Sequence, residues 1–207
     1  MKHSLLLLII VICFSLENAV AQNFSGGVLL GFNASQVSGD NYGGYNKAGI
    51  SGGFFVTKEL TEKSELEMRI TYSAKGSRDV PNPDKGKYTA YYMRLNYIEV
   101  PILYRYKYKM LWLMAGLSGG YLINSSIENE SGPFPENSIE NRAFKKYEVC
   151  TQLGVALPFA EHWEIELKSA DTFPLLPVRP HASGASFRLN FGQLNSVLAF
   201  SLKYRFK

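Results

Sequence analysis

Residues 64–77 read SELEMRITYSAKGS, in which apolar side chains alternate with charged or polar ones. Side chains two residues apart point to the same side of a strand, so Leu66 and Met68 share one face while Glu65 and Glu67 share the other. In a soluble protein the apolar face would line a core and the charged face would meet water. In a transmembrane barrel the apolar face meets lipid and the charged face lines the lumen. The stretch predicts a strand, and the rest of the chain indicates which side is inside.

The first residues of the chain predict a secretory signal peptide. Residues 1–3 are a short basic start, residues 5–16 are an apolar run of twelve, and residues 19–21 have the small-residue arrangement that precedes cleavage. A run of twelve is too short for a transmembrane helix, which needs roughly 20 residues. We therefore expect residues 1–21 to be removed and residues 22–207 to form a single domain.

Cysteine content, charge and hydropathy exclude several classes for the mature chain. Cys150 has no cysteine partner within residues 22–207, so an intramolecular disulfide is excluded. The net charge of +4 is too small and too dispersed to suggest nucleic acid as a partner. The best later apolar run, residues 110–117, has eight residues and is too short to span a membrane as a helix. An exported chain with 13 Tyr, 13 Phe and 2 Trp is then typical of a secreted β protein or an outer-membrane barrel.

The mature chain divides into eight candidate strands in which a period of two is clearer than any helical period. They are residues 23–36, 46–56, 64–76, 90–106, 111–124, 144–157, 162–172 and 195–206. Pro101 lacks the amide hydrogen that a ladder needs, so we expect a bulge or a register change near it. The pattern assigns no face to Trp112.

Long and short connections alternate between these candidate strands. The short ones are centred on residues 57–63, 107–110 and 158–161, and the long ones cover residues 37–45, 77–89, 125–143 and 173–194. Bacterial transmembrane barrels show this asymmetry, with short periplasmic turns and long external loops, and strands of about ten residues cross a bilayer when tilted. The sequence therefore predicts an all-β fold, an eight-stranded antiparallel transmembrane β-barrel in the bacterial outer membrane.

In such a barrel the charged faces of the strands point into the lumen and need partners there. Glu164 and Glu166 lie near the short-turn end of their strand, and Lys203 and Arg205 lie near the same end of the next strand. Glu65, Glu67 and Arg69 of the opening stretch form a second cluster, in which acidic and basic side chains are mixed. Because eight strands enclose a space that side chains just fill, we expect internal ion pairs, with a selective ion path as the alternative.

Aromatic residues gather near both ends of the candidate strands, where two interfacial belts are expected. The short-turn end has Phe24, Tyr104, Tyr106, Phe159, Trp163, Tyr204 and Phe206, and the long-loop end has Tyr72, Tyr88, Tyr91, Tyr92, Tyr121 and Phe173.

Five ordered stretches resemble the PorT-like family of small outer-membrane β-barrel proteins from Bacteroidetes-type bacteria. They are GFNASQVSGD at 31–40, GYNKAGISGGFF at 44–55, LNYIEVPILYRY at 95–106, AGLSGGYLI at 115–123 and LKYRF at 202–206. The resemblance implies an eight-stranded barrel with both termini in the periplasm. It implies no single activity, although one member is linked to protein secretion and gliding.

The sequence offers little for catalysis, so we expect no catalytic residue, cofactor site or metal site and no enzyme. His181 and Ser183 have the spacing of an outer-membrane lipid A deacylase pair, but they lie in a loop rich in Pro and Gly. A nucleophilic serine needs a positioned base and a third group that orients it. Cys150 and the distant His162 form no metal-ligand set with His181, and we expect Glu99 to face the lumen.

We therefore expect a structural, assembly-related or secretion-related barrel with a filled lumen and partner-binding external loops. The alternatives are a narrow porin-like channel for small solutes and a rim-located lipid A-modifying hydrolase. The expected partners are outer-membrane lipids and lipopolysaccharide, the barrel-assembly machinery during insertion, and secretion or envelope proteins, with no nucleic acid. Five loop cations are candidates for binding lipopolysaccharide phosphates; they are Arg142, Lys145, Lys146, Arg179 and Arg188.

Overall fold

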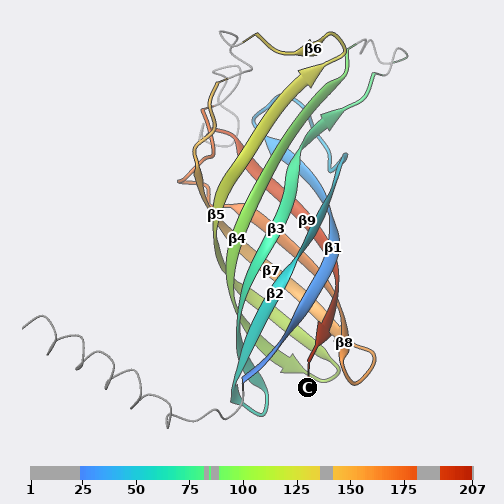
Figure 1. Cartoon of the computed structure of the whole chain (residues 1–207), viewed down its shortest axis with the longest axis vertical. Coiled ribbons are helices and arrows are strands. Elements are labelled where there is room, and N and C mark those ends of the chain that lie inside the picture. The colour runs from blue at the N-terminus through green and yellow to red at the C-terminus, as the bar shows by residue number, and fades with distance from the viewer. Residues whose placement is uncertain (1–23, 82–83, 85–88, 136–141, 181–191, 207) are drawn as a thin grey trace, which may run out of the picture.

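The computed structural model describes residues 24–81, 84, 89–135, 142–180 and 192–206, so the predicted signal peptide lies outside it. The described chain is built almost entirely of strands, which wind into one tall barrel (Figure 1). The strands are β1 (Phe24–Ser38), β2 (Lys47–Thr61), β3 (Ser64–Asp79), β4 (Tyr91–Tyr108), β5 (Leu111–Asn129), β6 (Gly132–Pro133), β7 (Tyr147–Pro158), β8 (Trp163–Thr172) and β9 (Leu194–Arg205). Among these residues no helix is long and apolar enough to cross a bilayer.

Eight long antiparallel strands close on themselves, which confirms the predicted fold. Their order is β4-β3-β2-β1-β9-β8-β7-β5, and the pairing of β4 with β5 completes the circle. The two-residue β6 only extends the far end of β5, where Glu128 pairs with Pro133. β4 and β5 reach farthest toward the long-loop end, whereas the C-terminus lies among the short turns (Figure 1).

The opening stretch has the sidedness of a membrane barrel. On β3, Glu65 and Glu67 are buried in the lumen, whereas Leu66, Met68 and Ile70 are exposed on the outside. Closure leaves no sheet edge in the membrane, so the backbone groups of the spanning strands are satisfied by their neighbours. The charged face of the strand is therefore inside, as the barrel interpretation requires.

The polarity of the sheet reverses along β4. From Ile98 toward the short-turn end, exposed outward positions are apolar or aromatic; they are Ile98, Val100, Ile102, Tyr104 and Tyr106. Beyond Ile98 in the other direction, Arg94 and Asn96 face outward, while Met93 and Leu95 are buried inside. A lipid-facing strand carries apolar residues outside and a water-facing one carries them inside. The reversal therefore marks the external boundary of the hydrocarbon layer.

An apolar plug fills the barrel above this boundary. It comprises the buried residues Val37, Tyr91, Met93, Leu95, Tyr97, Leu122 and Ile127, against which Tyr42, Phe134 and Phe144 pack. The ring of Tyr42 stacks on that of Tyr91 with 4.2 Å between centroids. Tyr91 therefore belongs to the interior and not to the external aromatic belt, which corrects the prediction for this residue. Tyr88 lies outside the described residues.

The bulge expected near Pro101 lies elsewhere. The β3–β4 ladder pairs Met68 with Ile102 and Thr71 with Glu99, so it keeps one register on both sides of the proline. The register shift of β4 falls instead between Asn96 and Tyr97 in its pairing with β5. β4 keeps its odd residues inside on both sides of this shift, so the reversal of polarity comes from the types of residue and not from a change of face.

Candidate functional site

Eight charged side chains form one ion-pair network inside the short-turn half of the barrel, here called the lower network. Its members come from β3, β4, β8 and β9, and all but Arg205 are buried; they are Glu65, Glu67, Arg69, Arg105, Glu164, Glu166, Lys203 and Arg205. Four carboxylates and four cations balance in charge, so the network needs no further counter-ion. Charges removed from water are tolerable when each is paired and hydrogen-bonded in this way.

Arg69 links opposite walls of the barrel. Its Nη1 and Nη2 atoms each donate to one oxygen of Glu166 at 2.7 Å, and its Nε atom donates to Glu67 at 2.5 Å. Two parallel bonds to one carboxylate are the strongest arrangement that an arginine makes. The sequence placed Arg69 in a cluster separate from Glu166, whereas the structure joins them.

Arg105 is the member that the sequence analysis missed. Its Nη1 atom lies 2.5 Å from Glu65 and 2.9 Å from Glu67, and its Nη2 atom lies 2.5 Å from Glu164. Its guanidinium also stands 5.2 Å from the ring centroid of Trp112. Trp112 thus lies at the short-turn mouth of the lumen, which settles the face that the sequence left open.

The predicted pairing of β8 with β9 is confirmed for Lys203 and corrected for Arg205. The Nζ atom of Lys203 lies 3.4 Å from Glu164 and 3.6 Å from Glu166, and it contacts Glu67 most closely. Arg205 instead binds Glu65 of β3 at 3.1 Å.

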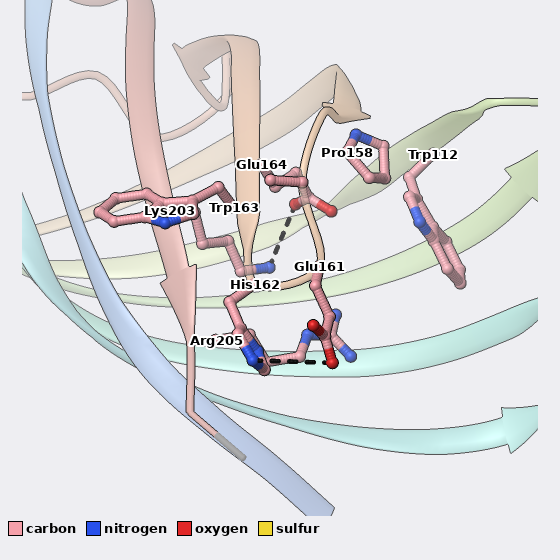
Figure 2. Close-up of a pocket in the computed structure, with 9 residues that line it drawn as sticks. Trp112, Pro158, Glu161, His162, Trp163, Glu164, Lys203 and Arg205 are labelled. Atoms are coloured by element: carbon pink, nitrogen blue, oxygen red, sulfur yellow. Dashed lines mark hydrogen bonds and ion pairs between the residues drawn. The ribbon is translucent and has the colours of Figure 1, made fainter.

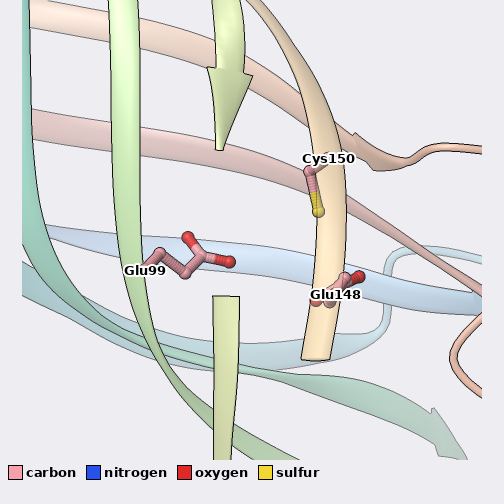
Figure 3. Close-up of side chains that lie close together, drawn as sticks. All are labelled: Glu99, Glu148 and Cys150. Carbon is pink, nitrogen blue, oxygen red and sulfur yellow. The ribbon is translucent and has the colours of Figure 1, made fainter. Parts of the chain in front are cut away.

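A second ion cluster lies in the middle of the lumen, where Glu99 reaches from β4 toward Glu148 and Cys150 of β7 (Figure 3). One ligand atom from each of these three residues lies within 4.8 Å of the others, as in a metal site. However, the ammonium of Lys75 contacts Glu99 and lies 3.0 Å from Glu148 and 3.8 Å from the sulfur of Cys150. The lysine thus occupies the place that a cation would take. Glu99 faces the lumen as expected.

Little open space remains between these clusters. A cavity of about 20 Å³ lies at mid-height, bounded by Arg69, Lys75, Glu99 and Lys168 among others. That volume holds about one water molecule. Lys168 donates to the side-chain oxygen of Gln152 at 2.9 Å. In the described part of the chain, the lumen is therefore filled by side chains.

The short-turn mouth holds a larger pocket of about 210 Å³. Figure 2 shows the lining, which consists of Trp112, Pro158, Ala160, Glu161, His162, Trp163, Glu164, Lys203 and Arg205. His162 Nε2 lies 3.9 Å from Glu161, but no serine, threonine or cysteine is among these lining residues. The lining therefore has no hydroxyl or thiol nucleophile, and lower-network side chains form part of its wall.

Arg179 and Asp40 hold loops onto the apolar plug at the other end. Arg179 is only 2% exposed; it donates to Gln193 at 2.8 Å and to the Arg142 carbonyl at 3.0 Å, and it covers the Phe144 ring. Burial raises the pKa of Asp40 to about 6, although Ser77, Tyr42 and Arg179 oppose the rise. Arg179 is thus a structural residue, which corrects its prediction as a phosphate ligand.

The other loop residues singled out from the sequence fall into two groups. Arg142, Lys145 and Lys146 are exposed and remain open to a ligand. The His181 and Ser183 pair and Arg188 lie outside the described residues.

Comparisons with known proteins agree with this geometry. A family model described as an outer membrane protein beta-barrel domain matches residues 20–170. No curated protein matches the sequence. Among solved structures, Neisserial surface protein A is 9% identical with a TM-score of 0.51, covering 89% of this chain and 98% of its own. Ail of Yersinia pestis is 10% identical with a TM-score of 0.47, covering 89% and 100%. The chain therefore belongs to the outer membrane protein beta-barrel domain family and is a small eight-stranded barrel of the bacterial outer membrane.

Proposed function

We propose that the protein is a non-conducting barrel that holds a rigid external platform for a protein partner of the cell envelope. The observation that carries this proposal is the apolar plug. Above the hydrocarbon boundary β4 and β5 continue as a water-facing sheet, with buried Leu95 and Leu122 inside and polar Asn96 and Asn124 outside. A packed interior gives this extension the rigidity of a soluble domain. The charge-balanced lower network fills the lumen in the opposite, short-turn half of the barrel.

The filled lumen favours a structural role over the narrow channel. A pore needs a continuous wet path whose sites an ion enters and leaves easily. In the described part of the lumen, the cations are side chains held in ion pairs, including Lys75 with Glu148 and Lys203 with Glu67. We expect the purified protein to give no reproducible single-channel steps in planar bilayers, whereas steps of constant size would contradict the proposal.

The platform is testable by photo-cross-linking in intact cells. A benzoylphenylalanine at Asn124 or Ser125, both exposed on the extension, should capture a discrete protein. The matched positions are Ile102 and Leu117, which are also exposed but lie within the lipid-facing belt. Protein adducts from the first pair alone would support the platform. Adducts from neither pair, or equally from both, would contradict it.

We also propose that the chain is a PorT-like member of its family and that residues 1–21 are its signal peptide. The ordered stretches, such as residues 31–40 and 95–106, support the first assignment, and the basic, apolar and small-residue order supports the second. N-terminal sequencing of the membrane-inserted protein should begin at Gln22. Deleting the gene should impair protein secretion, and unchanged secretion would contradict the PorT-like role.

A further inference from the structure

The ladder between β2 and β3 stops before the external ends of the two strands. β2 begins at Lys47 and β3 runs on to Asp79, but their ladder stops at the pair Ser51 and Ser73. Beyond that point, side chains of β1 donate hydrogen bonds to carbonyl groups of β3. Asn33 donates to the Ala74 carbonyl and Ser35 donates to the Gly76 carbonyl, each at 3.1 Å. The two strands stay in contact beyond the ladder, because a Cβ atom on Gly49 would lie 2.2 Å from the Ala74 carbonyl oxygen. The external ends of β2 and β3 beyond the ladder are here called the β2–β3 tip.

Three cations gather at the β2–β3 tip and on the adjoining part of β4. Arg78 pairs with Tyr92 and Gly76 pairs with Arg94, so the two arginines are diagonal neighbours on the outward face. Burial lowers the pKa of Lys47, which lies beyond the hydrocarbon boundary, and the charges of Arg94 and Arg78 lower it further. The three residues are therefore close enough to repel one another.

Their charge is only partly compensated within the described residues. Arg94 binds Glu128 at 2.7 Å in an open contact, with 49% and 35% of the two side chains exposed. The Arg78 guanidinium lies over the Tyr92 ring, and its buried Nε atom has no hydrogen-bond partner among the described residues. Lys47 donates to the carbonyl of its neighbour Ala48. Glu128 is thus the carboxylate that pairs with one of these three cations.

We expect these cations to lie at the level of the lipid head groups. Arg94 stands four residues beyond Ile98, the last exposed apolar position on the outward face of β4. Four residues of a tilted strand rise by roughly 10 Å, and long cationic side chains lean back toward the interface. Beside them Tyr72, from the external aromatic belt, donates to Asn96 at 2.9 Å.

We propose that Lys47, Arg78 and Arg94 bind a phosphate group of an outer-leaflet lipid. Guanidinium groups suit phosphate because they donate two parallel hydrogen bonds, and the free Nε atom of Arg78 supplies one donor. The position next to the apolar belt favours a lipid over a soluble anion, since the acyl chains of one lipid would contact the belt while its phosphate contacts the cations. The site lies at the edge of the platform of the proposed function, since Arg94 pairs with Ser126 of β5, but it depends neither on a closed lumen nor on a protein partner.

The test measures binding of diphosphorylated lipid A to the folded protein in neutral detergent by native mass spectrometry. The triple variant Lys47→Gln, Arg78→Gln, Arg94→Gln should bind about tenfold more weakly or worse, because charge-assisted contacts are lost. The matched control is Lys58→Gln, Lys107→Gln, Lys109→Gln, which removes three exposed cations at the short-turn end and should bind like the wild type. Equal binding by both triple variants would overturn the site.

Two further experiments on the wild-type protein test the site even if the triple variant folds poorly. On the wild-type protein, lipid A should protect Arg78 and Arg94 from phenylglyoxal, while the reactivity of the partly exposed Arg205, at the short-turn end, should not change. Absence of this protection would overturn the proposal without any variant. Inorganic phosphate at equal concentration should protect neither arginine. Equal protection would assign the three cations to soluble anions and overturn the lipid specificity of the site.

Discussion

The guanidinium of Arg69 on β3 binds both carboxylate oxygens of Glu166 on β8, each at 2.7 Å. Three strands, β2, β1 and β9, separate β3 from β8 in the sheet, so this contact crosses the lumen instead of joining neighbours. Both side chains are 1% exposed. The pair therefore braces opposite walls of the barrel from the inside.

Removing one partner of this brace should be costly. Arg69→Met leaves Glu166 and Glu67 buried with too few partners, and we expect a loss of about 3–5 kcal/mol of unfolding free energy. The double variant Arg69→Met, Glu166→Met keeps the network balanced and should regain much of that loss. Urea unfolding in lipid vesicles, followed by tryptophan fluorescence, measures both.

The exposed pair of Arg94 and Glu128 is the control for the brace, because its N–O distance is also 2.7 Å. Arg94→Met should cost no more than about 1 kcal/mol, as exposed ion pairs do. A brace variant as mild as this control would show that the lower network adds nothing to stability.

Gly49 should tolerate no side chain. A Cβ atom there would lie 2.2 Å from the Ala74 carbonyl oxygen, at the point where β2 leaves β3. We expect Gly49→Ala to destabilise the barrel by about 1–3 kcal/mol, the usual range for an overpacked site. Gly119→Ala is the matched change, since its Cβ would meet nothing within 4 Å and stability should stay within about 0.5 kcal/mol of the wild type. Equal effects in heat-shift electrophoresis and urea unfolding would contradict the close approach.

Asp40 should make stability depend on pH. Its pKa is raised to about 6 from 3.8, so the folded state binds its proton more tightly than the unfolded state. The resulting stabilisation is complete below pH 3.8 and is lost as pH rises through about 6. Since the shift is about two units, the wild type should lose up to about 3 kcal/mol relative to Asp40→Asn between pH 4 and pH 7.5.

Urea unfolding midpoints across this pH range measure the difference between the wild type and Asp40→Asn. A constant difference between the wild type and Asp40→Asn at all pH values would show that Asp40 is not strained by burial.

The strands and the β8–β9 part of the lower network were predictable from the sequence. A period of two, clear in several segments, and the turn-rich connections located the eight long strands. The charges near the short-turn ends of β8 and β9 were expected to lie on one face, and the structure places Glu164 opposite Lys203. Arg205 was assigned to the wrong acid because partners across the lumen depend on barrel curvature, which no single strand encodes. Arg105 was missed because Pro101 was taken to shift the register of β4, although the register holds.

The sequence of β4 contains a signal that could have predicted the apolar plug. Apolar residues of β4 occupy odd positions through Leu95 and Tyr97 and even positions from Ile98 onward. That change of phase marks where the outside of the sheet passes from water to lipid. The belt of interfacial aromatics was assigned from proximity to strand ends alone, and so Tyr91 was placed outside.

Cysteine scanning along β4 tests the reversal of polarity most directly. In a Cys150→Ser background reconstituted in vesicles, a cysteine at Arg94 should react with a membrane-impermeant maleimide, and one at Leu95 should react only after unfolding. A fluorophore on a cysteine at Ile102 should be quenched by brominated lipid. Quenching by brominated lipid at position 94, together with aqueous labelling of the folded protein at position 102, would contradict the assignment of lipid-facing and water-facing surfaces.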